Sequence, residues 1–280
     1  MKLFKVWFTI FSAFYALNTF AQSALDGGDD QYKPRIGQEG KDVVWVPTTN
    51  ELLAIMLKTA KVNSKDLVYD LGSGDGRIAI AAAKDFGAQA VGIEFNPAMA
   101  ELAQRNVNRS GLGDRVKIIN GDIFVEDFSK ATVVTMYLLP ELNIALRPTI
   151  LKMKPGTRVT SHAFDMGDWD ADIEIDGPAR AFYWIVPALV EGEWLISGME
   201  PRRTILKLSQ NYQKIGGTLQ IGADSYPLLN PKLDGATLSF TYLDRDKAPH
   251  FVIMTVDKNE IKGIYKSRAF NENVITGKRL

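Results

Sequence analysis

The sequence predicts an α/β protein: a Rossmann-like, doubly wound, mostly parallel seven-stranded sheet, followed by a small antiparallel all-β module. Two observations predict the sheet. Residues 67–84 read as a strand, a glycine-rich turn and a helix, and apolar runs then alternate with helical runs up to residue 188. A third observation predicts the β module, a barrel or sandwich. From residue 191 the pattern changes to short alternating runs separated by turn residues.

The glycine-rich turn is the most informative part of the chain. An apolar run from residue 67 ends in Asp70, and glycines follow at positions 72, 74 and 76. Glycine permits positive φ and lets a ligand approach the main chain closely. The helix that follows exposes free N–H groups at its start, which suit a carboxylate or phosphate. The turn therefore indicates a ligand site, although glycines that only permit packing would give the same pattern.

Two further acids strengthen this interpretation. Residues 89–94 read as a second strand that ends in Glu94, and residues 116–122 read as a third that ends in Asp122. In nucleotide-binding sheets an acid in the position of Glu94 accepts hydrogen bonds from ribose hydroxyls. Asp122 is placed to accept one from an adenine amino group. Three consecutive strands thus end in carboxylates at one edge of the sheet, unless these acids are only solvated strand ends.

The spacing of the glycines separates two classes of cofactor. Dinucleotide enzymes use G-x-G-x-x-G, whereas this chain has D-x-G-x-G-x-G, and Asp70 is a poor neighbour for a diphosphate and a good one for a cation. The pattern resembles motif I of class I S-adenosylmethionine-dependent methyltransferases. The resemblance implies S-adenosylmethionine as the cofactor, with its amino-acid part at the turn. The cofactor-binding residues that it implies are Asp70, Gly72, Ser73, Gly74, Gly76, Glu94 and Asp122, with Thr48 at the rim.

The remaining elements of this domain follow in order. Thr49 or Asn50 is expected to cap a helix over 51–60, whose apolar residues fall at helical spacing. Asn96-Pro97 predicts the start of a helix that stops at Gly111. Pro148 is expected to bend or split the helix that begins at Glu141. The other expected strands are 131–138, 157–163, 172–175 and 181–187.

The end of the fourth strand, residues 136–143, is where family members place groups that face the methyl acceptor. It lacks the Asn-Pro-Pro-Tyr motif of enzymes that methylate adenine or glutamine amides. With the Asp-Leu-Gly-Ser-Gly-Asp-Gly-Arg and Val-Pro-Thr segments, it resembles the branch containing the mitochondrial lysine methyltransferases of an ATP synthase subunit and the adenine nucleotide carrier. The resemblance implies a protein acceptor and an apolar slot that would lower the pKa of a lysine amine. The slot residues expected are Tyr137, Leu138, Leu139 and Trp169.

Two residues are candidates for the acceptor side of the catalytic site. Tyr137 would line the slot, and Glu141 would orient an incoming ammonium, although it could equally interact with the dipole of its own helix. His162 could take a proton, but a hydrogen-bonded histidine at a strand end is the commoner case. Acids at 165, 168 and 170 could attract a basic substrate, or they could simply be solvated turn residues.

The β module is expected over 191–280, after a methyltransferase domain over 43–188. Its six clearest alternating runs are 194–196, 204–208, 218–221, 237–242, 251–256 and 261–265. They predict an antiparallel meander. The module carries no catalytic constellation, so we expect it to bind a partner or ligand, or to cap the sheet.

The first 21 residues read as a signal peptide, with lysines at 2 and 5, an apolar run and a cleavage site before Gln22. Residues 22–42 read as a linker. We therefore expect an exported, periplasmic protein with no stable membrane span once the signal is removed; an uncleaved leader would instead anchor it. The cofactor is made in the cytosol, and nothing in the sequence explains its supply outside.

Composition excludes several classes of site. Lysine plus arginine equals aspartate plus glutamate at 33 each, so net charge gives no argument for nucleic acid as a partner. Without cysteine, and with two histidines, no metal site is expected. Three functions stay open: N-methylation of a protein lysine, methylation of a small molecule, and an exported non-catalytic binding protein that uses the β module.

Overall fold

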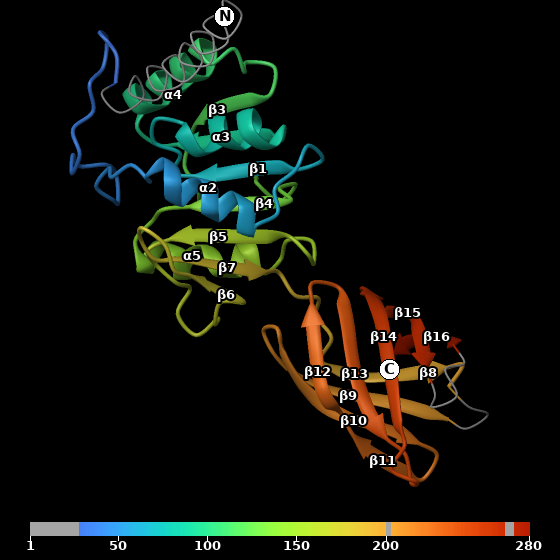
Figure 1. The fold of residues 1–280 in the computed structure, drawn as a ribbon. Helices are drawn as coiled ribbons and strands as arrows, with labels where there is room; N and C mark the ends of the chain where they lie inside the picture. The colour runs from blue at the N-terminus through green and yellow to red at the C-terminus, as the bar shows by residue number, and fades with distance from the viewer. Residues whose placement is uncertain (1–27, 200–202, 267–271) are drawn as a thin grey trace, which may run out of the picture. The chain divides into compact units, whose positions relative to one another are not determined.

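The computed structural model describes residues 28–199, 203–266 and 272–280, which divide into two compact units (Figure 1). Residues up to Leu146 form the first unit together with Val159–Tyr183, and Arg147–Arg158 with Trp184–Leu280 form the second. The signal peptide expected over 1–21 lies outside the described residues. Within them, no helix has the length and apolar character needed to cross a membrane.

The first unit is built around a seven-stranded sheet, and helices and strands alternate through most of it (Figure 1). In chain order, its elements are α2 (Asn50–Thr59), β1 (Leu67–Leu71), α3 (Arg77–Phe86), β2 (Gln89–Glu94), α4 (Pro97–Arg109), β3 (Val116–Asn120), β4 (Val133–Met136), α5 (Pro140–Ile150), β5 (Arg158–His162), β6 (Ile173–Ile175) and β7 (Ala181–Ile185).

The strand order is β3-β2-β1-β4-β5-β7-β6, with β1 parallel to both β2 and β4, and β6 antiparallel to β7. This confirms the predicted doubly wound sheet. The chain moves outward from β1 to β3 and then restarts at β4 on the other side of β1. Right-handed crossovers therefore place α3 and α4 on one face and α5 on the other, as Figure 1 shows. The gap between β1 and β4 is the topological switch point, where such sheets bind ligands.

The helix starts follow from local capping chemistry. The Thr49 side chain accepts a hydrogen bond from the Leu52 N–H at the start of α2, and Asn96 accepts one from the Met99 N–H at the start of α4. Pro148 was expected to bend or split its helix, and it does not split it, since α5 runs unbroken to Ile150. Proline removes one i→i−4 hydrogen bond and crowds the carbonyl four residues earlier, a cost that α5 sustains at Pro148 without breaking.

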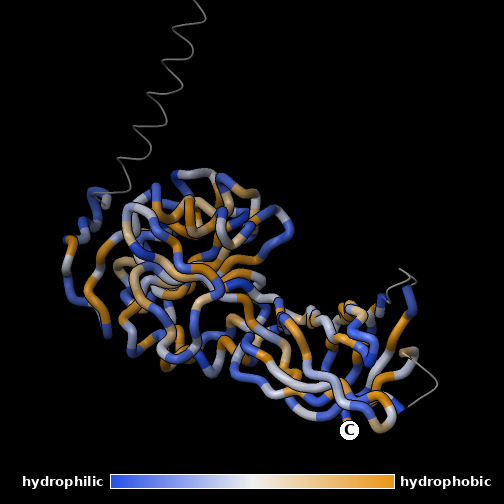
Figure 2. The backbone as a smooth tube through the Cα atoms, turned by 60° about the horizontal axis from the view of Figure 1, so that its bottom comes forward, coloured by the Kyte–Doolittle hydropathy of each residue, from blue (hydrophilic) through white to orange (hydrophobic). Residues whose placement is uncertain are grey.

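Packing of the helices on the sheet requires small residues at a close approach. A Cβ on Gly76 would lie 3.2 Å from the Ala103 Cβ on α4, so the start of α3 and the middle of α4 meet almost backbone to backbone. Figure 2 shows hydrophobic segments running through the middle of this unit and hydrophilic segments in its outer loops. This packing fixes the ends of β1 and β2 relative to each other, which matters for the site.

The second unit is a nine-stranded antiparallel sheet in the order β11-β10-β9-β8-β16-β15-β14-β13-β12. Its strands are β8 (Gly192–Ser197), β9 (Thr204–Asn211), β10 (Lys214–Ile221), β11 (Asp224–Pro227), β12 (Leu229–Asp234), β13 (Thr237–Leu243), β14 (Pro249–Asp257), β15 (Glu260–Lys266) and β16 (Glu272–Arg279). Because β10 also contacts β12, and β11 contacts β13, the sheet curls into a nearly closed barrel. Of the two predicted forms, barrel and sandwich, the structure has the barrel-like one.

All six predicted strands are present, but β11, β12 and β16 were not predicted. Pro227 and Pro231 fall in β11 and β12 and weaken the strand pattern, yet these are the two edge strands of the sheet, where a missing N–H is tolerated. β16 joins the two meanders by pairing with β8, and this long-range pairing leaves no local signal. The core of this unit is apolar, and buried residues alternate with exposed ones along β14. A binding role for the barrel stays a prediction.

Candidate functional site

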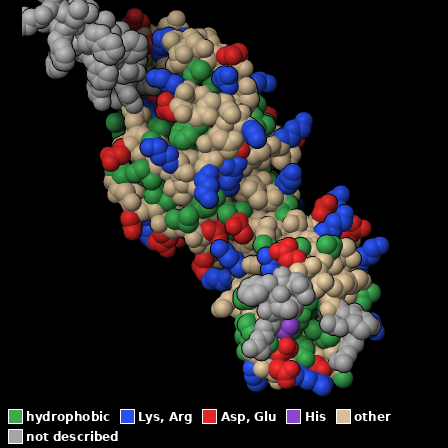
Figure 3. Space-filling view, turned by 45° about the vertical axis from the view of Figure 1, so that its right-hand side comes forward, with side chains coloured by type: hydrophobic (Ala, Val, Ile, Leu, Met, Phe, Trp, Pro, Cys, Tyr) green, Lys and Arg blue, Asp and Glu red, His purple; other side chains and the backbone are tan. Residues whose placement is uncertain are grey.

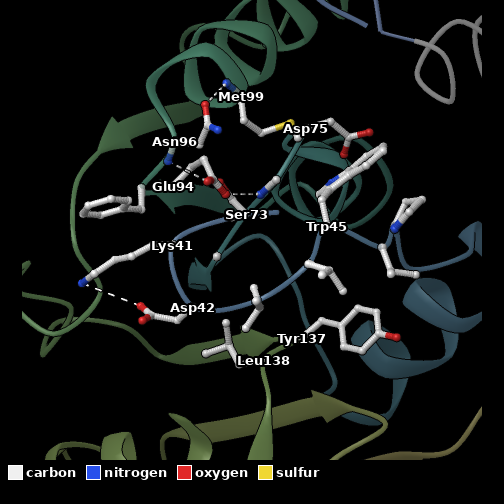
Figure 4. Close-up of a pocket in the computed structure, with 18 of the residues that line it drawn as sticks. Lys41, Asp42, Trp45, Ser73, Asp75, Glu94, Asn96, Met99, Tyr137 and Leu138 are labelled. Carbon is white, nitrogen blue, oxygen red and sulfur yellow. Dashed lines mark hydrogen bonds and ion pairs between the residues drawn. The ribbon is translucent and has the colours of Figure 1, made fainter. Parts of the chain in front are cut away.

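A pocket opens at the switch point, above the carboxyl ends of β1, β2 and β4 (Figure 4). Its cavity volume is about 120 Å³. All eight residues expected to bind the cofactor except Gly76 line it, as does Tyr137. Residues 38–47 also line it, although half of them, 38–42, fall in the segment expected to be a linker.

The glycine turn has the backbone that its sequence requires. φ is +73° at Gly72, +55° at Gly74 and +81° at Gly76, a region that side chains disfavour. Space is also limiting, since a Cβ on Gly74 would lie 2.8 Å from the indole Nε1 of Trp45. The turn therefore presents bare main chain to the pocket.

Glu94 closes the turn from the neighbouring strand. Its Oε2 accepts a hydrogen bond from the Gly74 N–H at 2.8 Å, and its Oε1 accepts one from the Asn96 N–H at 2.9 Å. Burial raises the pKa of Glu94, and the backbone donors oppose that shift. Each carboxylate oxygen keeps a lone pair, so Glu94 can accept two further hydrogen bonds, the number that a ribose diol offers.

Asp70 lies at the bottom of the pocket and is 2 % exposed. Its Oδ1 accepts a hydrogen bond from the Thr135 hydroxyl of β4 at 2.6 Å. Burial raises the pKa of Asp70 to about 7; the bond from Thr135 lowers it, and the charges of Asp75 and Glu94 raise it. A cation placed beside Asp70 would favour the ionised form, as the sequence analysis expected.

A buried ion pair supports the turn, and it was not predicted. Arg77 donates from Nη2 to Asp75 Oδ2 at 2.7 Å and from Nε to Asp75 Oδ1 at 3.0 Å, and both side chains are nearly inaccessible. Arg77 Nη1 also donates to the Thr48 carbonyl at 3.3 Å, and the Asp75 carbonyl accepts from the Asn106 side chain at 2.8 Å. The pair thus connects the turn to α4 and to the chain before α2.

The third acid, Asp122, lies two residues beyond β3. Its Oδ2 accepts from Lys41 Nζ at 2.7 Å, and its Oδ1 accepts from the Phe124 N–H at 2.9 Å. The Lys41 ammonium also lies 4.7 Å from the centre of the Phe95 ring. The hydrogen bond from Lys41 holds the pKa of Asp122 below its usual range. Lys41 belongs to no motif with a fixed spacing, which explains why sequence reasoning missed it.

The acceptor side is an uncharged aromatic wall. Tyr137 packs against His162, with 3.7 Å between ring centres and 34° between the ring planes, and His162 Nδ1 is 3.0 Å from the Thr48 hydroxyl. Burial lowers the pKa of His162 to about 4, so the ring is neutral at neutral pH. The hydrogen-bonded interpretation of His162 is therefore confirmed. Asn143 of α5, fully buried, donates to the carbonyls of Phe164 and Asp165 and pins the loop after β5.

Three residues expected on the acceptor side do not line the pocket. Glu141 is exposed in the first turn of α5, Leu139 is 39 % exposed beside it, and Trp169 is fully buried away from the pocket. Leu138, which was also expected there, does line it, and so does Leu142, which was not expected. Successive side chains of a helix are rotated by about 100°, so within α5 Glu141 and Leu142 point in different directions, and Leu142 reaches the pocket. The catalytic role of Glu141 stays a prediction.

The residues present fit a cofactor that combines adenosine with an amino acid. Bare main chain at the turn, the free lone pairs of Glu94 and the buried Asp70 offer the groups that such a molecule needs. Ser73 adds a further sign, because its hydroxyl is buried at the pocket and no described residue hydrogen-bonds to it. A buried polar group is rarely left unpaired.

Comparison with known proteins identifies the family. Residues 70–173 match the ANTKMT methyltransferase domain. Over 130 residues the chain is 48 % identical to a protein-lysine N-methyltransferase of Saccharolobus islandicus (strain REY15A), an alignment that covers 46 % of this chain and 81 % of that protein. The chain belongs to this family of S-adenosylmethionine-dependent methyltransferases. This methyltransferase uses S-adenosylmethionine as its cofactor, as the resemblance implied.

Two further relatives define the extent of the similarity. A Xenopus laevis protein named as the lysine N-methyltransferase of an ATP synthase subunit is 31 % identical to this chain over 129 residues. The alignment covers 46 % of this chain and 56 % of that protein, so the chain spans about half of that relative's length. A crystal structure described as an RNA methyltransferase from Salinibacter ruber, in complex with S-adenosyl-L-homocysteine, is 45 % identical with a TM-score of 0.51. The structural match covers 52 % of this chain and 96 % of the chain from Salinibacter ruber. The family match ends before the barrel begins.

The protonation of Asp70 predicts a pH dependence of cofactor binding. Below pH 7 the free protein holds a proton on Asp70, which the cationic amino group of the cofactor must displace. The affinity for S-adenosylhomocysteine should fall by up to about tenfold per pH unit below 7, and it should level off above 7. His162, with a pKa of about 4, does not titrate in this range.

Calorimetric titration at several pH values, in buffers of different ionisation enthalpy, measures both the affinity and the protons released. About one proton should be released per cofactor bound below pH 7. The Asp70→Asn variant is the control and should bind more weakly, with little pH dependence. A wild-type affinity that is flat across pH 7 would show that Asp70 does not face the charged part of the cofactor.

Proposed function

We propose that this methyltransferase transfers a methyl group to the ε-amino group of a lysine in a protein. The observation that carries the proposal is the uncharged wall of Tyr137 and Leu138 on the acceptor side of the pocket, with neutral His162 packed behind Tyr137. An amine that enters an apolar opening loses part of its preference for the charged form, and only the neutral amine is nucleophilic. The names of the relatives from Saccharolobus islandicus and Xenopus laevis support the same acceptor.

The chemistry requires alignment more than a base. When bound, the cofactor supplies a methyl group on a sulfonium, a strong leaving group that an amine nitrogen displaces. The chain's own residues hold the two reactants in line and exclude water, which accounts for much of the rate. Tyr137 is supported for that purpose by the imidazole of His162, which the Thr48 hydroxyl holds in place.

The charge of the catalytic unit favours a basic acceptor. Within this unit, acids outnumber lysine and arginine, and residues 165–176, which follow β5, carry six exposed acids. Such a stretch attracts a lysine-rich segment and repels nucleic acid. On the face drawn in Figure 3, basic side chains are spread in ones and twos with acidic ones among them, rather than gathered in a stripe.

RNA is the second candidate acceptor, because the structure from Salinibacter ruber is described as an RNA methyltransferase and is 45 % identical to this chain. The deciding experiment incubates the purified protein and radiolabelled S-adenosylmethionine with cell protein, with total RNA and with a metabolite extract. Label in protein, found on lysine after hydrolysis, supports the proposal. Label confined to RNA or to small molecules would overturn it.

Tyr137 should matter for turnover rather than for cofactor binding. Replacing it with alanine removes the wall and frees His162, so the acceptor is held less well; we expect kcat to fall about tenfold to a hundredfold. The Tyr137→Phe variant keeps the ring on His162 and should retain most of the activity. Steady-state kinetics and titration with S-adenosylhomocysteine separate the two effects. If affinity is lost while kcat is unchanged, Tyr137 belongs to the cofactor site.

Export is a separate proposal that rests on the sequence alone. We propose that residues 1–21 are removed and that the protein acts outside the cytosol. Mass spectrometry of the protein from its native host should find an N-terminus at or near Gln22. An intact Met1 in a cytosolic pool would overturn export and remove the question of how the cofactor is supplied.

A further inference from the structure

We propose that residues 37–45, here called the pocket hairpin, form a reversible cover of the cofactor site, in which Lys41 positions Asp122 and Trp45 contacts the cofactor beside the glycine turn. The segment lies before the residues that match the family, 70–173. The proposal concerns cofactor binding and is independent of the identity of the acceptor.

The pocket hairpin is built by its own backbone hydrogen bonds. The Gly37 N–H donates to the Trp45 carbonyl at 2.8 Å, the Trp45 N–H to the Gln38 carbonyl at 2.9 Å, and the Gly40 N–H to the Val43 carbonyl at 2.9 Å. The tight turn places Lys41 and Asp42 at its tip. Polar, glycine-containing sequence of this kind reads as a linker, although here it folds back on itself.

The tip and the base of the hairpin contact opposite ends of the pocket (Figure 4). At the tip, Lys41 lies 2.7 Å from Asp122 Oδ2 and 4.7 Å from the centre of the Phe95 ring. At the base, the Trp45 indole lies against Gly74, close enough that a Cβ there would be 2.8 Å from it. One short segment therefore spans the site from the predicted adenine end to the amino-acid end.

Ion pairs and hydrogen bonds anchor the chain on both sides of the hairpin. Before it, Asp29 pairs with Arg105 at 2.6 Å and with Arg109 at 3.0 Å on α4. After it, buried Thr48 is held by Arg77 and His162. The two anchors fix the path of the chain across the pocket and leave the hairpin as the part that can move.

Few contacts hold the hairpin closed. Val44 is 52 % exposed, and the side chains of Lys41 and Asp122 are 38 % and 25 % exposed. Half-exposed ion pairs contribute little and are screened by salt, and segments with few buried contacts open readily. The hairpin can thus open to admit the cofactor and close over it.

The Lys41 contact orients Asp122 for adenine. Lys41 and the Phe124 N–H each occupy one oxygen of the carboxylate and fix its plane, while Asp122 still lines the pocket. A fixed carboxylate binds an amino group with less loss of entropy than a free one. Without Lys41, Asp122 would also be free to turn toward solvent.

The test measures the affinity and the dissociation rate of S-adenosylhomocysteine on the full chain, by calorimetry and stopped-flow displacement. Lys41→Ala should raise Kd about threefold to fivefold through faster dissociation, and Lys41→Arg should restore most of it. Trp45→Ala should raise Kd about tenfold. Lys33→Ala is the matched control, because Lys33 is an exposed lysine just before the pocket hairpin and does not line the pocket.

Two further measurements separate positioning from a general loss of folding. Added salt should weaken binding by the wild type more than by Lys41→Ala, because only the wild type has the ion pair to lose. In an Asp122→Asn background, Lys41→Ala should have little further effect. Unchanged affinity in Lys41→Ala would overturn the proposal. So would tighter binding, which would mean that Lys41 competes with the cofactor for Asp122 and the face of Phe95.

Discussion

Replacing Glu94 with alanine should weaken cofactor binding strongly. The carboxylate has two lone pairs for the ribose, and a hydrogen bond to a charged group contributes about 1.5–3 kcal/mol. The Kd for S-adenosylhomocysteine should therefore rise by a factor of about 10 to 150. The loss should lie in the upper part of that range, because Glu94 also receives the N–H groups of Gly74 and Asn96 and so holds the glycine turn in shape.

Isothermal titration calorimetry with S-adenosylhomocysteine measures the Kd of Glu94→Ala and of its control variants, and so tests whether Glu94 binds the ribose. Glu94→Gln keeps one accepting oxygen and should bind with intermediate affinity. Glu101→Ala removes an exposed acid from α4 and should bind like the wild type. If Glu94→Ala binds the cofactor as tightly as wild type, the assignment of Glu94 to the ribose is wrong.

The sequence predicted the parts of the site that depend on local chemistry. Asp70, Gly72, Gly74 and Glu94 could be found because a glycine turn between a strand and a helix has a fixed spacing, and because parallel strands end at a common edge. The same logic predicted the order of the elements in the first unit and the caps of α2 and α4. Each of these signals extends over only a few residues.

The rest of the site depends on contacts between distant parts of the chain. The bond between Lys41 and Asp122 joins residues 81 positions apart, and the contact between Thr48 and His162 joins residues 114 apart. Neither pairing has a spacing that a sequence can display. On the acceptor side, Tyr137, Leu138 and Leu142 of the predicted segment 136–143 line the pocket, whereas Leu139 and Glu141 do not, because the sequence does not display the direction of each side chain at the start of α5.

The ion pair between Asp75 and Arg77 is local in sequence, yet it also contacts distant parts of the chain. Its disruption should have the largest effect on stability. Asp75→Ala would leave the Arg77 guanidinium, 7 % exposed, without its carboxylate. Breaking a buried ion pair by removing one partner costs about 3–5 kcal/mol. Loss of the pair would also release the contact between Arg77 and the Thr48 carbonyl, so the cofactor site should loosen together with the start of α3.

Hydrogen exchange with mass spectrometry measures this effect one unit at a time, and the barrel serves as an internal reference. In Asp75→Ala, protection should fall in peptides from β1, α3 and α4 and stay unchanged in peptides from β13 to β15, which belong to the other unit. The double variant Asp75→Ala with Arg77→Met removes both charges and should recover much of the lost stability, since the cost of the single change is mainly that of an unpaired buried cation. A double variant as unstable as the single one would show that Asp75 stabilises the turn through its own contacts and not by neutralising Arg77.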